Sequence, residues 1–195
     1  MINGSQVRKP EHEVDKLFLN RWSPRAMSGE GVSEGELMTL LEAARWAPSS
    51  YNNQPWRILY ARRDTQHWPV FLGLLVEGNR AWAKDAAALL LFVSKETFDF
   101  NGQPYPTHSF DTGAAWENLA LQATLSGLVT HGMQGFDYER ARAELRIPEG
   151  FRVEAMAAVG RPGDPSKLPE RTREREKPSD RKPLSEITCE GPFGF

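Results

Sequence analysis

The sequence contains a single cysteine, Cys189, which excludes an internal disulfide framework and leaves no Cys-x-x-Cys pair for zinc. Its longest apolar run, from Ala86 to Val93, is far too short to cross a bilayer. The polar N-terminal residues lack the apolar stretch of a signal peptide. The Gly-x-Gly-x-x-Gly fingerprint of a Rossmann nucleotide site is also absent. These absences predict a soluble protein in a reducing, cytoplasmic setting.

The chain has little excess charge of either sign. A formal net charge of −2 gives no polybasic field, so neither nucleic acid nor an anionic membrane is an expected partner. A length of 195 residues is enough for one domain with a sizeable core and short for two. We expect a single domain over residues 14–187, a flexible segment 1–13 and an extended C-terminal arm over 162–195.

Apolar periodicity and capping residues predict alternating helices and a few strands. Ser33 and Glu36 form a capping-box pattern at the start of one helix, and Pro48 ends it. The run 87–94 is continuously apolar and bounded by charges, which is typical of a buried central strand. Further helices are predicted over about 14–20, 66–76, 109–128 and 137–145, and further strands over 57–62 and 153–160.

Two features predict a second subunit. The predicted helix over 109–128 is apolar or small on most faces, so it must be covered on several sides. Residues 162–182 are rich in proline and charge and lack any apolar period. They end in Pro183–Ile187, which we expect to pair with a sheet. An arm crossing to a neighbouring subunit accounts for both parts of that pattern.

A basic cluster, Arg21-Trp22-Ser23-Pro24-Arg25, is the first candidate site. In an extended stretch alternate residues point the same way, so Arg21, Ser23 and Arg25 share a face. Two guanidinium groups and a hydroxyl can hold a phosphate dianion by charge-assisted hydrogen bonds. Taken alone, such a short basic motif is more typical of a solvated turn between helices.

Two further motifs have the polar groups that a flavin ring needs. The proline-bounded turn Pro48–Trp56 carries Ser49, Ser50, Asn52 and Gln54, whose donors and acceptors match the carbonyls and nitrogens of a flavin edge. The segment 132–137 has two glycines, so its backbone can approach a planar ligand closely at Met133, Gln134 and Gly135. A backbone N–H at Gln134 or Gly135 beside flavin N5 would stabilise negative charge that develops there. Each motif is also compatible with an ordinary turn.

The fourth motif lies in the arm. Arg181 is a candidate second grip on the phosphate, and Arg175 and Lys177 lie upstream of it. A solvated, mixed-charge arm is the alternative interpretation for most of these side chains.

In this order the four motifs resemble the FMN-dependent nitroreductase family, which also includes flavin reductases and iodotyrosine deiodinases. The family's Arg-x-Ser-x-Arg clamp matches 21–25, and its Pro-Ser-x-x-Asn-x-Gln-Pro-Trp motif matches 48–56. Its Glu-Gly-Phe-Asp turn matches 134–137 with Gln134 in place of Glu, and its Arg-Lys-Pro-Leu motif matches 181–184. The resemblance implies an α+β fold with α/β three-layer character. A mixed, mostly antiparallel sheet would be flanked by helices, in a domain-swapped homodimer with FMN at the interface.

The resemblance also implies chemistry and a substrate face. NAD(P)H would bind transiently and pass hydride through flavin N5 to a nitroaromatic, quinone or similar acceptor in a ping-pong cycle. No catalytic side chain is expected, and no metal. Expected alternatives are a specialised flavin reductase or reductive dehalogenase, and a flavin-binding protein without catalysis. The side chains expected to line the substrate face are Tyr51, Trp82, Phe100, Tyr105 and His108.

Overall fold

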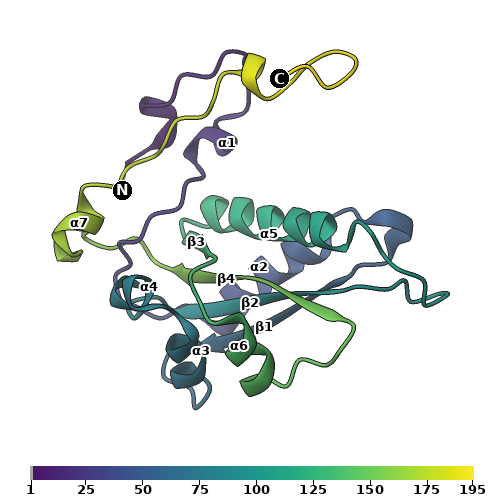
Figure 1. Cartoon of the computed structure of the whole chain (residues 1–195). Coiled ribbons are helices and arrows are strands. Elements are labelled where there is room, and N and C mark those ends of the chain that lie inside the picture. The colour runs from purple at the N-terminus through teal and green to yellow at the C-terminus, as the bar shows by residue number, and fades with distance from the viewer. Residues whose placement is uncertain (1) are drawn as a thin grey trace.

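A computed structural model describes residues 2–195 and consists of a four-stranded sheet with helices on both faces (Figure 1). The helices are α1 (Lys16–Asn20), α2 (Glu34–Arg45), α3 (Trp68–Leu74), α4 (Glu77–Ala83), α5 (His108–Leu125), α6 (Tyr138–Glu144) and α7 (Glu170–Arg173). The strands are β1 (Trp56–Arg62), β2 (Ala88–Lys95), β3 (Val129–Met133) and β4 (Phe151–Gly160). Their order is β1-β2-β4-β3, and each pair of neighbours is antiparallel. The predicted α+β fold is confirmed.

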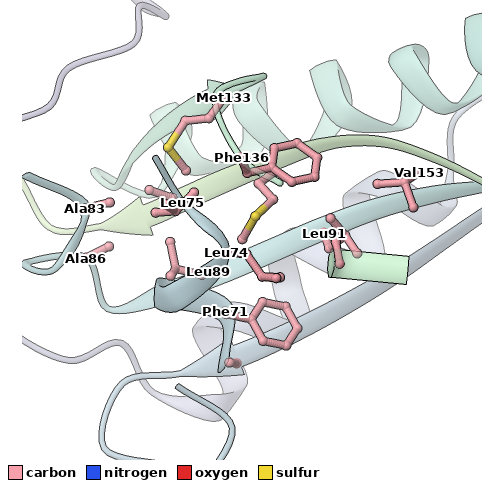
Figure 2. Packing of buried hydrophobic residues seen from close by; sticks show 14 of the residues in the cluster. Phe71, Leu74, Leu75, Ala83, Ala86, Leu89, Leu91, Met133, Phe136 and Val153 are labelled. Atoms are coloured by element: carbon pink, nitrogen blue, oxygen red, sulfur yellow. The ribbon is translucent and has the colours of Figure 1, made fainter. Parts of the chain in front are cut away.

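Strand β2 lies between two apolar layers, which explains its continuous apolar sequence. Leu89 and Leu91 face a core cluster that includes Phe71 of α3 (Figure 2). Leu90 and Phe92 face the opposite cluster, which α2 and α5 supply. Successive side chains of a strand point to opposite faces, so a strand covered on both sides must be apolar throughout.

Local sequence signals explain the helix boundaries that were predicted. The Ser33 hydroxyl accepts the Glu36 N–H at 3.1 Å, and the Glu36 carboxylate accepts the Ser33 N–H at 2.8 Å. This reciprocal pair is the predicted capping box at the start of α2. Strand β3 was not predicted as a strand, because its five residues include glycine and carry no alternation of apolar and polar side chains.

The two terminal segments lie side by side and project beyond α5 (Figure 1). The Arg8 Nε donates to the Ser179 carbonyl at 2.9 Å, and the Leu184 N–H donates to the Glu11 carboxylate at 3.1 Å. A short 3₁₀ helix, Gly4–Gln6, packs against α1. The expected flexibility of residues 1–13 stays a prediction.

Within residues 2–195 the segment Pro183–Ile187 pairs with no strand, and its expected pairing with a neighbouring subunit stays a prediction. Leu184–Glu186 forms an exposed 3₁₀ helix, and the Ile187 N–H returns to the Leu184 carbonyl at 3.0 Å. Proline has no N–H to offer to a sheet, and in residues 2–195 no strand edge lies beside this segment. The local turn therefore satisfies the backbone instead.

Candidate functional site

The basic cluster lies in an extended segment between α1 and α2, where exposure alternates as predicted. Arg21, Ser23 and Arg25 are partly exposed, whereas Trp22 and Pro24 are buried. The Trp22 indole N–H donates to the Ile2 carbonyl at 3.2 Å, which fixes the inward side of the segment. The three polar side chains therefore share the outward side.

This outward side opens on a cavity of about 280 Å³. The lining residues are Arg8, Arg21, Trp22, Ser23, Arg25, His131, Arg175, Lys177, Ser179 and Arg181. Six of them are cationic, and within residues 2–195 no aspartate or glutamate side chain lines the cavity. The structure thus brings the predicted clamp at 21–25 together with Arg181, Arg175 and Lys177.

The cations of this cavity repel one another. Burial is the main cause that lowers the pKa of Arg8, and the positive charges of Arg181 and Arg21 lower it further. An arginine stays charged despite such a shift. Two nearby carboxylates offset part of this charge, because Arg21 Nε lies 3.1 Å from Glu117 Oε1 and the charge of Asp180 raises the pKa of Arg8. The six cations that line the cavity still give it the electrostatic character of an anion site.

His131 of β3 lines the cavity and also contacts the apolar core. Its Nδ1 lies 3.3 Å from the Pro24 carbonyl oxygen, and its ring lies 4.8 Å from the Trp82 ring. Burial, and secondly the charge of Arg25, lowers the pKa of His131 to about 4. The imidazole is therefore neutral near pH 7, and it contributes hydrogen bonding without charge.

Arg8, His131 and Ser179 were missed by sequence reasoning. Arg8 lies in a polar segment without periodicity, and its Nη1 donates to the Leu19 and Arg21 carbonyls at 2.7 and 2.9 Å. Nothing in the sequence indicates that the segment around Arg8 folds back onto residues 19–21. His131 carries a weak signal, because it precedes the glycine motif at 132–137 by one residue.

The turn 48–56 lies at the other end of α5 and lines a separate cavity of about 410 Å³. The Ser50 N–H donates to the Asp111 carboxylate at 3.0 Å, and the Gln54 N–H donates to the Ser49 hydroxyl at 3.0 Å. This second cavity is lined by Tyr51, Asn52, Asn53, Gln54, Arg57, Asp99 and Phe100. It shares no lining residue with the basic cavity.

Three residues of this turn have left-handed backbone angles, with φ of 52° at Tyr51, 52° at Asn52 and 49° at Gln54. Such angles are unfavourable for residues other than glycine, although asparagine tolerates them. The side-chain amide of Gln54 donates to the Asn52 carbonyl at 3.0 Å and so helps to hold the turn. Asn52 and Gln54 remain exposed, so their amides are accessible to a ligand.

The glycine motif begins where β3 ends. The Gly135 carbonyl accepts the Val76 N–H at 3.1 Å and the Asn79 amide at 3.0 Å. Within residues 2–195, the N–H groups of Gln134 and Gly135 donate to no protein acceptor. Met133 can offer only its backbone here, because the residue is 5% exposed and its side chain packs in the core (Figure 2).

Two of the five side chains expected at the substrate face are buried, so those two predictions are wrong. Trp82 is 2% exposed, because α4 turns its apolar side toward the sheet. Tyr105 is 1% exposed, and its hydroxyl donates to Asp111 and contacts the Ser50 carbonyl oxygen at 3.2 Å. Burial, followed by the hydrogen bond to Asp111, raises the pKa of Tyr105 to about 12.

Of the other three candidates, Tyr51 and Phe100 line the second cavity. Tyr51 and Phe100 are 81% and 63% exposed, and their ring centroids are 5.7 Å apart. The His108 side chain is mostly buried, with its Nδ1 2.7 Å from the Ser94 hydroxyl. Tyr51 and Phe100 thus form an exposed aromatic surface beside the turn, whereas His108, at the start of α5, contacts Ser94 and Glu154.

The Nitroreductase family model matches residues 19–72 and 65–161. The NADH dehydrogenase of Thermus thermophilus is 29% identical over 206 residues, covering 91% of this chain and 96% of its own. A crystal structure of an oxidoreductase containing FMN has a TM-score of 0.92 and 48% identity over 96% of both chains. A candidate nitroreductase in complex with FMN, from Desulfovibrio desulfuricans, has a TM-score of 0.71 and 26% identity over 92% of this chain and 96% of its own.

Proposed function

The chain belongs to the Nitroreductase family, and on that premise we propose that it is an FMN-dependent NAD(P)H oxidoreductase that reduces small acceptors such as nitroaromatics or quinones. Relatives named as an FMN-containing oxidoreductase and an NADH dehydrogenase support the cofactor and the class of reaction. The observation that carries the proposal is the basic cavity, which six cations line and which, in residues 2–195, no carboxylate lines.

The residues present fit a flavin mononucleotide. A phosphate dianion matches the cavity in charge, and the Ser23 hydroxyl adds a neutral hydrogen-bonding partner. Arg21, Arg25 and Arg181 would hold the phosphate. Each charge-assisted hydrogen bond contributes about 1.5–3 kcal/mol, so a few of them supply much of a micromolar affinity.

The exposed backbone beyond β3 would serve the flavin ring. Gln134 follows His131 by three residues, which is about 10 Å along an extended strand. The phosphate would therefore lie near His131 and the flavin ring near Gln134. The unpaired N–H groups of Gln134 and Gly135 can donate to an acceptor beside them. When bound, FMN supplies hydride transfer between NAD(P)H and the acceptor in two successive half-reactions.

A second copy of the chain would complete the site. The turn 48–56 lines a different cavity from the basic cluster, and a flavin shared between two subunits would bring the two motifs to one ligand. Helix α5 offers exposed apolar side chains for such an interface, since Phe110 and Leu125 are 80% and 67% exposed. We therefore infer a homodimer. In it, Asn52 and Gln54 of one subunit face the ring of a flavin whose phosphate is held by the other subunit.

The acceptor would meet an aromatic surface. Tyr51 and Phe100 present exposed rings beside the turn, and a planar nitroaromatic or quinone can stack on such rings. No side chain is needed as a nucleophile for this class of reaction, because the cofactor carries the chemistry. The protein's part is to bind, orient and exclude water.

The proposal is tested by titrating the protein with FMN and comparing Arg25→Ala with wild type. Losing one charge-assisted contact should weaken FMN binding about ten- to hundred-fold. Arg171→Ala removes the same charge from an exposed position of the arm outside the cavity and should leave the affinity unchanged. If wild-type protein does not bind FMN, or Arg25→Ala binds it equally well, the phosphate site is not in this cavity.

Stopped-flow mixing separates an oxidoreductase from a protein that only binds flavin. Rapid bleaching of the flavin absorbance by NADH or NADPH, followed by recovery on adding a quinone or nitroaromatic, is the expected result. A flavin that stays oxidised with both nicotinamides would contradict the proposed activity while leaving the binding site intact.

A further inference from the structure

Glu176 is the one buried residue of the arm 162–195. It is 7% exposed, and its side chain only 2%. The rest of the arm is exposed or half-buried, as its polar sequence predicts. A carboxylate is costly to bury, so its burial requires specific partners.

The partners of Glu176 lie in residues 21–26, the phosphate loop, which contains the basic cluster. Its Oε1 accepts two backbone N–H groups, from Arg25 at 2.7 Å and from Ala26 at 2.8 Å. Its Oε2 lies 4.0 Å from Arg25 Nη1 and has no hydrogen-bond partner within residues 2–195. One carboxylate therefore joins two segments about 150 residues apart in sequence.

The residues on either side of Glu176 point to its role. Arg175 and Lys177 both line the basic cavity, whereas Glu176 does not. Adjacent residues of an extended or turning segment point in different directions, so fixing the central side chain inward fixes its two neighbours. The contact thus fixes the positions of three cations of the cavity: Arg25 in the loop, and Arg175 and Lys177 on either side of Glu176.

We propose that Glu176 is a positioning residue for the phosphate site: it anchors the arm to the loop and so assembles the cations without touching the ligand. This inference rests on the proposed function of the cavity. It assigns to an acidic residue a positive contribution to anion binding, which simple Coulomb repulsion would not predict.

An anchoring role and a purely electrostatic role for Glu176 therefore predict opposite changes in FMN affinity when the carboxylate is removed. If the carboxylate acts only through its charge, removing it makes the cavity more positive and tightens FMN binding. If it acts by anchoring, removing it frees the arm and weakens FMN binding. Glu176→Gln separates the two, because a glutamine carbonyl can still accept both N–H groups while the charge is gone.

The experiment measures FMN dissociation constants for the full-length wild type, Glu176→Ala, Glu176→Gln and the control Glu174→Ala. Glu174 is exposed and lies two residues away, so its substitution removes the same charge without the anchor. We expect Glu176→Ala to bind FMN at least about ten-fold more weakly, because two charge-assisted contacts are lost. Glu176→Gln and Glu174→Ala should stay within about threefold of wild type.

Riboflavin, which lacks the phosphate, tests whether the effect is confined to this site. Anchoring predicts that Glu176→Ala loses affinity for FMN but not for riboflavin. A general loss of structure would reduce both. Glu176→Ala that binds FMN as tightly as wild type, or more tightly, would overturn the inference.

A measurement without flavin keeps this inference separate from the proposed function. Residues 167–182 are rich in arginine and lysine, so trypsin can cleave the arm wherever it opens. Without its anchor the arm should open more often, so flavin-free Glu176→Ala should be cleaved faster than wild type. If wild type fails to bind FMN, the proposed function fails, while faster cleavage still supports the anchor. Equal cleavage rates in the two proteins would contradict the anchor.

Discussion

Gly135→Ala is expected to destabilise the protein at the end of β3. A Cβ at this position would lie 2.6 Å from Asn79 Nδ2 and 3.1 Å from Val76 Cγ2. The Asn79 side chain can turn away, but it then loses its 3.0 Å hydrogen bond to the Gly135 carbonyl. That loss costs about 1 kcal/mol, and the close contact with Val76 adds overpacking strain, for a total of about 1–3 kcal/mol.

Thermal unfolding of the flavin-free protein measures this cost. For a chain of this length, each kcal/mol lowers Tm by about 2–4 °C. Gly78→Ala is a matched control on α4, because nothing lies within 4 Å of its added Cβ, and it should be neutral or slightly stabilising.

A double variant tests the stated cause. Asn79→Ala alone should cost about 1 kcal/mol, and combined with Gly135→Ala it should cost less than the sum, because the clash and the hydrogen bond involve the same side chain. An unchanged Tm for Gly135→Ala, or costs that simply add, would refute the reasoning.

Two further predictions concern buried titratable groups. The pKa of His131 is lowered to about 4, so as pH falls the unfolded chain takes up this proton first, and stability present above about pH 6.5 is lost toward pH 4, by up to about 3 kcal/mol. Chemical denaturation at several pH values should show this slope in wild type and a flatter one in His131→Gln; equal slopes would show that His131 is not its source. Tyr105→Phe should lower the free energy of unfolding by about 1–3 kcal/mol, because its hydroxyl bonds the buried Asp111. Tyr60→Phe, at a half-exposed position of β1, should change it by less than about 0.5 kcal/mol, and a matching loss in both variants would contradict the role of that hydrogen bond.

Local signals made much of the fold predictable. The capping box at Ser33 and Glu36 and the apolar run of β2 each depend on residues close in sequence, so their patterns identify them directly. Alternation along 21–25 likewise predicted which side chains share a face. Strand β3 escaped prediction because only its pairing with β4 defines it.

The candidate site was predictable only in its motifs. Arg8 and Glu176 take part through contacts that span more than 100 residues, and no local pattern encodes them. Trp82 and Tyr105 were predicted to line the substrate face but are buried. The sequence does not indicate whether an aromatic side chain in a loop or a short helix points to solvent or to the core. Tertiary packing decides that direction.

The basic cavity takes one arginine from residue 8 and another from residue 181, so the two ends of the chain meet around it. Fusion partners and purification tags at either end are therefore not neutral additions to this protein. A bulky tag beside the N-terminal segment, or an early stop that removes Arg181, would act on the cavity as directly as a substitution inside it. Untagged protein is the proper reference for every affinity measured at this site.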